Sequence, residues 1–142
     1  MVQTLDSKGF ALYDTPFEFR HSGGRMASIR DVVEALGRRE GVEAVIILGN
    51  DGLPIASHVA NGGDPEMLAA LIPSVITASL QLGQYAGRGH LTTGVLEYAA
   101  GYAVIAHLSA EAILLVLARA RTNIGPLLYD LTRHRAEIAG LL

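Results

Sequence analysis

Residues Ala44–Val59 read AVIILGNDGLPIASHV and predict a β-hairpin. The run Ala44–Leu48 is rich in β-branched residues, which favour strands. The sequence GNDG (residues 49–52) follows, and Asn, Asp and Gly tolerate the positive φ angles that tight hairpin turns require. Leu53–Val59 then runs back as the second strand. An antiparallel sheet is therefore part of the fold.

Helical patterns lie on both sides of this hairpin. Before it, Ser28 with Asp31 three residues later has the pattern of a capping box, and apolar residues follow at helical spacing until a glycine ends the helix. After the hairpin, Asp64 is a good N-cap and Pro65 a good first helical residue. This second helix is predicted to run to about Ala86, where a Gly-Arg-Gly sequence stops it.

Three further strands and a last helix complete the pattern. Short turns join neighbouring strands, so the pairing is antiparallel within each group. The fold class is α+β, a single-layer sheet covered by helices, in the order helix, two strands, helix, three strands, helix. The strands are predicted at Leu91–Tyr98, Tyr102–Leu108 and Ile113–Ala118, and the helix, capped by Thr122-Asn123, at Ile124–Ala139.

Composition limits the function classes. The 142 residues fit one domain, predicted at 27–142, preceded by an extension at 1–26 that could be a flexible tail, an added strand or clamp, or a cloning artefact. The net charge is −3 and the one lysine is Lys8, so nucleic-acid binding is not expected. Cysteine is absent, which excludes disulfides and thiolate zinc sites and fits a cytoplasmic protein.

No catalytic pattern is visible. The five histidines lack the helical or strand spacing of a metal site, and neither a P-loop nor a GxSxG sequence occurs. Glu97 is the one acid in an apolar region, and a structural role there is favoured over that of a functional acid. We therefore expect no enzyme activity, no catalytic residue, no cofactor and no metal.

A gap in charge marks the middle of the chain. Residues 67–110 hold two charged side chains, Arg88 and Glu97. The second helix has two apolar stripes, one at Met67, Leu71, Val75, Ala78 and Leu82 and another at Leu68, Ile72, Ile76 and Leu80. One sheet covers one side of a helix, so we expect a second copy of the chain to cover the other; the alternative is another helix of the same chain.

The same helix raises the question of a membrane. Its apolar stretch Met67–Leu82 is shorter than the roughly 20 residues that a spanning helix needs, and it contains Pro73 and several hydroxyl side chains. We interpret it as a buried helix and expect no direct membrane binding.

Four stretches of the chain, in order, resemble the Roadblock family, also called the dynein light chain 7 domain. Together they extend from about Ser28 to Leu142. They are the strand–DG–strand hairpin Val45–Ser57, the helix end Gln84-Tyr85-Ala86, the buried strand Leu114–Ala118, and the Asn-Ile-Gly opening of the last helix within Thr122–Leu128. In addition, Ala11–Glu18 is loosely similar to the segment before the domain in the bacterial MglB-like type.

This resemblance implies a five-stranded antiparallel sheet with profilin-like or longin-like layering and a homodimer. In such a dimer the second helices pair and edge strands, here Leu91–Tyr98, join into one sheet. The residues expected at the dimer interface are Leu68, Leu71, Ile72, Val75, Ile76, Ser79, Leu82, Thr93 and Val95.

The family's proteins are non-enzymatic platforms that bind Ras-like small GTPases, motor subunits or signalling partners. The resemblance therefore implies a regulator of a small GTPase's nucleotide cycle, with Arg88, Arg119 and Arg121 as candidate partner contacts. Solvated loop charges are the favoured interpretation of these arginines. Two alternatives remain open: a structural adaptor without effect on GTP hydrolysis, and a small-ligand sensor.

Overall fold

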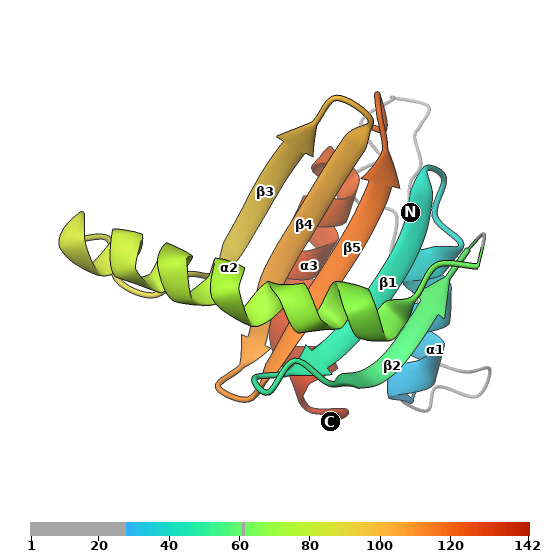
Figure 1. Ribbon diagram of the computed structural model, residues 1–142. Coiled ribbons are helices and arrows are strands. Elements are labelled where there is room, and N and C mark those ends of the chain that lie inside the picture. Colours follow the sequence, from blue (N-terminus) through green and yellow to red (C-terminus); the bar gives the residue numbers. More distant parts are fainter. Residues whose placement is uncertain (1–27, 61) are drawn as a thin grey trace, which may run out of the picture.

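The structure is a computed structural model that describes residues 28–60 and 62–142 (Figure 1). The predicted extension at residues 1–26 lies outside these residues. The predicted order of helices and strands is confirmed. The elements are α1 (Ile29–Gly37), β1 (Val42–Gly49), β2 (Pro54–Val59), α2 (Pro65–Tyr85), β3 (Thr93–Tyr98), β4 (Gly101–Ser109), β5 (Ala112–Arg119) and α3 (Gly125–Ala139).

The five strands form one antiparallel sheet in the order β2-β1-β5-β4-β3. The first hairpin joins the later strands through β1 and β5, where Ile46 lies opposite Leu115. This arrangement places β1 and β5 inside the sheet and leaves β2 and β3 as its two edges.

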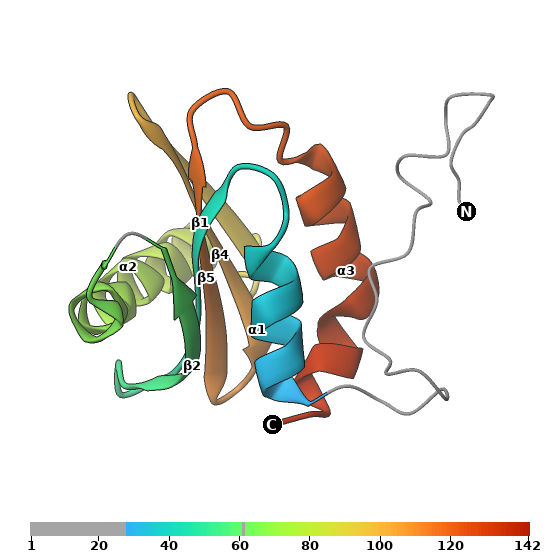
Figure 2. The same cartoon turned by 90° about the vertical axis from the view of Figure 1, so that its right-hand side faces the viewer.

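Helices cover both faces of the sheet (Figures 1 and 2). Alternate residues of each strand point to opposite faces, so two separate cores form. Val45 and Ile47 of β1 belong to the core beneath α1 and α3. Ile46 and Leu48 belong to the core beneath α2. The inner strands are therefore buried on both faces over most of their length.

Short polar side chains fix the helix starts. Ser28 and Asp31 form the predicted capping box at α1. The Asp64 carboxylate accepts hydrogen bonds from the backbone amides of residues 66 and 67 at the start of α2. The third helix differs from the prediction: α3 begins at Gly125, and its N-cap is Ile124, without a side-chain cap hydrogen bond, instead of Thr122-Asn123. Asn123 Oδ1 accepts a hydrogen bond from the Gly125 amide in the turn before the helix.

Candidate functional site

The two apolar stripes of α2 lie in different environments. Ile72 and Ile76, of the second stripe, are 6% and 7% exposed and pack against the sheet. Leu71 and Leu82, of the first stripe, are 59% and 70% exposed. The expectation that one sheet covers one side of this helix is confirmed, and the second side is open in the single chain.

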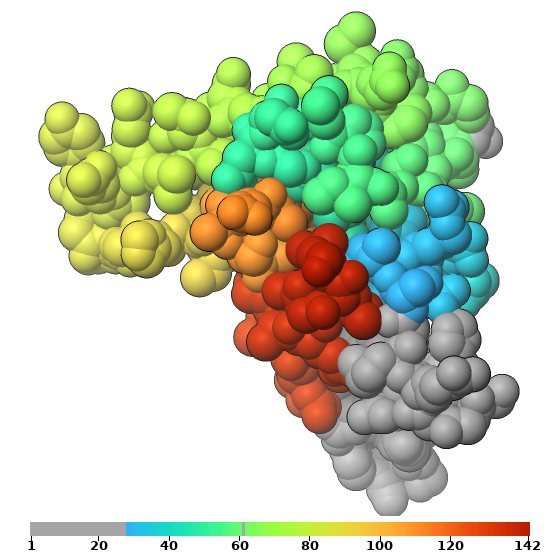
Figure 3. Space-filling view, turned by 90° about the horizontal axis from the view of Figure 1, so that it is seen from below, coloured from blue at the N-terminus to red at the C-terminus, as the bar shows by residue number. Residues whose placement is uncertain are grey.

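The C-terminal half of α2 projects beyond the sheet (Figures 1 and 3). Leu82 and Tyr85 lie on this half, and Tyr85 is 92% exposed. On β3, Leu96 and Tyr98 pair with residues 103 and 101 of β4 and are also exposed. Because Ala103 belongs to the core beneath α2, Leu96 and Tyr98 lie on that same side of the sheet. We call Leu71, Leu82, Tyr85, Leu96 and Tyr98 the open apolar face.

The residues predicted for a dimer interface divide into three groups. Ile72 and Ile76 are buried in the core of their own chain, which leaves little of their surface exposed. Leu68, Val75, Ser79 and Thr93 are half-buried. The open positions are Leu71, Leu82 and Val95.

The two positions predicted on β3 lie on the side away from α2. Thr93 and Val95 pair with Ala106 and Val104, which belong to the core beneath α1 and α3. Arg135 Nη2 of α3 donates to Thr93 Oγ1 at 2.8 Å. The Thr93 hydroxyl therefore already has a partner within its own chain.

Sequence reasoning missed Tyr85, Leu96 and Tyr98. Tyr85 continues the stripe of Leu71 and Leu82 at helical spacing, so that signal was present. In β3, successive side chains alternate between the two faces of the sheet. The sequence alone does not say which of the two alternating sets faces α2, because that depends on the register with β4.

Within the described residues, α2 is also the one helix that is long and apolar enough to cross a membrane by length and composition. Its burial is low, with 17% of the apolar window buried inside the structure. The sequence-based interpretation of a buried helix therefore holds for the side on the sheet and not for the open side.

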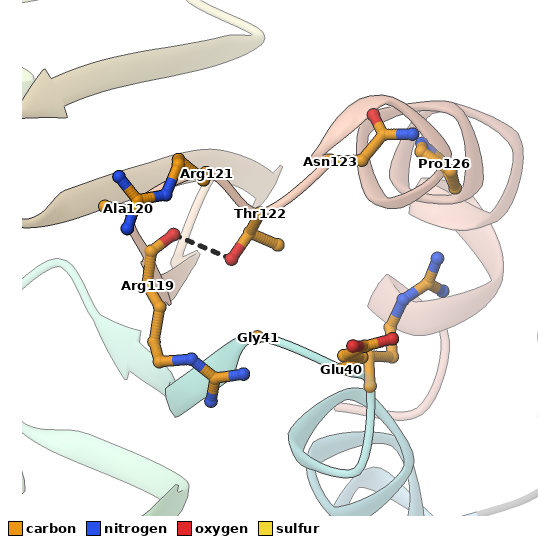
Figure 4. A pocket seen from close by; sticks show the side chains of 9 residues that line it. Glu40, Gly41, Arg119, Ala120, Arg121, Thr122, Asn123 and Pro126 are labelled. Carbon is orange, nitrogen blue, oxygen red and sulfur yellow. Dashed lines mark hydrogen bonds between the residues drawn. The ribbon is translucent and has the colours of Figure 1, made fainter.

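The three candidate arginines separate into two places. Arg88 follows α2, and its Nη1 donates to the Ala86 carbonyl oxygen at 3.2 Å. Arg119 and Arg121 lie at the end of β5 and line a pocket of about 450 Å³ (Figure 4). A third arginine, Arg39 from the end of α1, also lines it. We call this the arginine pocket; its other lining residues are Glu40, Gly41, Ala120, Thr122, Asn123 and Pro126.

Backbone contacts hold the arginine pocket in shape. The Arg119 amide donates to the Gly41 carbonyl oxygen at 2.8 Å, which ties the end of β5 to the start of β1. Thr122 Oγ1 donates to the Arg119 carbonyl oxygen at 2.7 Å. Gly41 has φ +88°, and a Cβ there would lie 2.4 Å from Thr122 Oγ1. A glycine is therefore required at this contact for both its conformation and its size.

One ion pair supports the back of the pocket. Arg39 Nη1 and Asp130 Oδ2 of α3 are 2.7 Å apart, and the Asp130 side chain is 9% exposed. This pair joins the end of α1 to α3. The carboxylate thus balances the charge of Arg39 and leaves Arg119 and Arg121 without an ion pair among the described residues.

Arg135 has a structural position further along α3, at the contact with β3 and β4. Its guanidinium donates to the backbone carbonyl oxygens of Thr92, at 2.9 Å, and of His107. Burial lowers the pKa of Arg135 below its usual value, because desolvation disfavours the charged form. The side chain thereby ties α3 to the edge of the sheet. His107 Nε2 is buried nearby without a hydrogen-bond partner in the described structure.

The described residues contain no group of three metal-ligating His, Asp or Glu side chains. Glu97 is exposed on β3. Glu97 is not among the residues of the open apolar face or of the arginine pocket. What the two surfaces offer is an apolar contact area and an arginine-lined hollow.

Comparison with known proteins agrees with this geometry. The Roadblock/LC7 domain family matches residues 28–118. An uncharacterized protein of Methanocaldococcus jannaschii, MJ0310, is 30% identical over 74% of this chain and 90% of its own length. A second protein of that organism, MJ1340, is 27% identical over 78% of this chain and 96% of its own length.

Solved structures show the same fold. Myxococcus xanthus MglB superposes with a TM-score of 0.72, at 19% identity, over 80% of this chain and 93% of its own. A Roadblock/LC7 domain from Streptomyces avermitilis gives 0.71, at 17% identity, over 80% and 97%. Profilin IA of Acanthamoeba castellanii gives 0.53, at 14% identity, over 80% and 98%, which reflects the expected profilin-like layering. With this order of strands and helices and a family match over most of its described length, the chain belongs to the Roadblock/LC7 domain family.

Proposed function

We propose that the chain forms a cytoplasmic homodimer that binds a Ras-like small GTPase and modulates its nucleotide cycle. The observation that carries this proposal is the open apolar face. Its five large side chains, on a projecting helix and an edge strand, resemble an interface more than the outer surface of a monomer. Membership of the Roadblock/LC7 family supports a small GTPase as the partner, since proteins of this family act as platforms that bind small GTPases.

Two copies related by a two-fold axis would cover this face. Each projecting α2 would lie across the partner, over the side of β3 that carries Leu96 and Tyr98. The β3 edges would pair, which would satisfy backbone groups that an edge strand leaves open. The side chains that the sheet leaves exposed on α2 would then be buried at the interface.

The first test is the mass in solution, measured by light scattering on a sizing column over a dilution series. We expect 30.0 kDa, twice the 15.0 kDa of one chain. The second test mixes the protein with the Ras-like GTPases of the same source and measures both complex formation and phosphate release. A complex with an altered rate supports the proposal.

A structural adaptor is the second candidate, because the open apolar face specifies a contact area and no catalytic group. Binding with an unchanged rate of phosphate release would favour this adaptor. A monomer that forms no complex with any of the GTPases would contradict both proposals. A monomeric variant at Leu82 is the matched control, because it tests whether partner binding requires the dimer.

A further inference from the structure

We infer that the arginine pocket binds the phosphate group of a small, hydroxyl-bearing organic phosphate, such as a sugar phosphate. The inference stands independently of the proposed GTPase regulation, because it rests on residues outside the open apolar face. It gives the chain a ligand site that its role as a platform does not require.

The charges of the pocket favour an anion. Arg119 and Arg121 form no ion pair with the described residues, whereas Arg39 is balanced by Asp130. Guanidinium groups donate two parallel hydrogen bonds to phosphate oxygens, which makes arginine well suited to phosphate recognition. The N-terminal turn of α3 also borders the pocket through Pro126, and the positive end of a helix dipole adds to the attraction.

The backbone at Arg121 gives an independent reason to assign a role to its side chain. Its φ is +65°, and it is the one non-glycine residue with positive φ among the described residues. A bulky side chain in this left-handed conformation costs free energy that a glycine would avoid. Strain of this kind is concentrated at functional sites.

The remaining lining residues indicate more than a bare phosphate. The pocket holds about 450 Å³, far more than one phosphate group occupies. Figure 4 shows Arg119 reaching toward Gly41, Glu40 on the opposite side, and Asn123 at the start of the last helix. A carboxylate and an amide accept hydrogen bonds from hydroxyl groups. A phosphate against Arg119 would therefore leave the hydroxyls of the same ligand to face Glu40 and Asn123.

The pocket is accessible in the proposed dimer. It lies where the ends of β5 and α1 meet, with the start of α3 beside it. The open apolar face contributes none of its lining residues. A dimer would therefore carry two such pockets.

The test is a titration of the full chain with ribose 5-phosphate, followed by amide NMR shifts at constant ionic strength. We expect saturable shifts centred on Gly41, Arg119 and Thr122, and tighter binding of ribose 5-phosphate than of inorganic phosphate. The double variant R119Q/R121Q should weaken binding by at least about tenfold, the range for hydrogen bonds to charged groups. The matched control Arg30→Gln removes one exposed charge at the far end of α1 and should leave binding unchanged.

Several results would overturn the inference. These are shifts that do not saturate, shifts that R30Q reduces as much as R119Q/R121Q does, and equal binding of inorganic phosphate and the sugar phosphate. If the double variant fails to fold, Glu40→Gln provides a second measurement. It removes a repulsive carboxylate from the rim and should strengthen binding of inorganic phosphate, so unchanged or weaker binding would contradict the assigned pocket.

Discussion

Replacing Leu82 with glutamate should separate the proposed dimer into folded monomers. Leu82 is 70% exposed in the single chain and lies on the half of α2 that projects beyond the sheet. Leucine and glutamate have similar helix propensities, and surface substitutions usually change stability by about 0.5 kcal/mol or less. The fold of one chain should therefore tolerate the change.

The effect on the dimer should be large. Burying one leucine side chain contributes about 1.5–3 kcal/mol, and a two-fold interface contains the residue twice, so about 3–6 kcal/mol is lost. This corresponds to a dissociation constant raised by roughly 10²- to 10⁴-fold. This loss of binding free energy is a lower bound, because a buried carboxylate without a partner adds its own desolvation cost.

Light scattering on a sizing column measures the outcome directly. The wild type should elute at 30.0 kDa and the variant at 15.0 kDa, with far-ultraviolet circular dichroism unchanged. Leu142→Glu is the matched control, since Leu142 is 49% exposed but lies at the C-terminus, outside the open apolar face. A Leu82→Glu protein that stays at 30.0 kDa would refute the assigned interface. If that variant unfolds, Tyr85→Glu, at a residue 92% exposed, repeats the test.

Three further predictions concern the rest of the molecule. Gly41→Ala should lower stability by roughly 2 kcal/mol, seen as a lower melting temperature, because the added Cβ would meet Thr122 at a positive φ; an unchanged melting temperature would contradict this account. Asp130→Ala should lower the urea midpoint by an amount equal to about 2–3 kcal/mol, since Arg39 loses its carboxylate; a shift under about 0.5 kcal/mol would show that the pair contributes little. In a vesicle sedimentation assay the chain should stay in the supernatant, because in the proposed dimer a partner copy covers the apolar side of α2; co-sedimentation would favour a membrane surface as the occupant instead.

Local signals in the sequence were sufficient for most of the secondary structure. The capping box at Ser28 and the N-cap at Asp64 lie where predicted, because capping depends on residues within one turn. The two stripes of α2 also separate at most positions, since a continuous helix fixes the angle between them. The exceptions are Val75, which packs against the core, and Leu80, which is 37% exposed. The strand limits moved by a few residues, and β3 begins at Thr93 instead of Leu91, because pairing with β4 sets where it starts.

Non-local contacts account for what the sequence did not reveal. The pairing of β1 with β5 joins two groups of strands that are each locally hairpin-like, and no local pattern specifies it. The same pairing assembles the arginine pocket, since the Arg119 amide bonds to Gly41 at the junction of those strands. In the sequence, Arg39 and the pair Arg119 and Arg121 are separate small charges far apart in the chain. These arginines come together in one pocket because the strand order places β1 beside β5.

The open apolar face and the arginine pocket are formed by different residues, so binding at one does not require a change of structure at the other. The open apolar face belongs to α2 and the edge strand β3, whereas the arginine pocket is formed where β1 and β5, the inner strands, meet α1 and α3. Arg119 is held through its own backbone, by Gly41 and Thr122, so the position of the pocket depends on contacts within one chain. A ligand there would stabilise the folded chain without competing for the interface. Coupling between ligand and partner has a direct route through β5, because its Leu115 lies in the core beneath α2 and its last residue is Arg119.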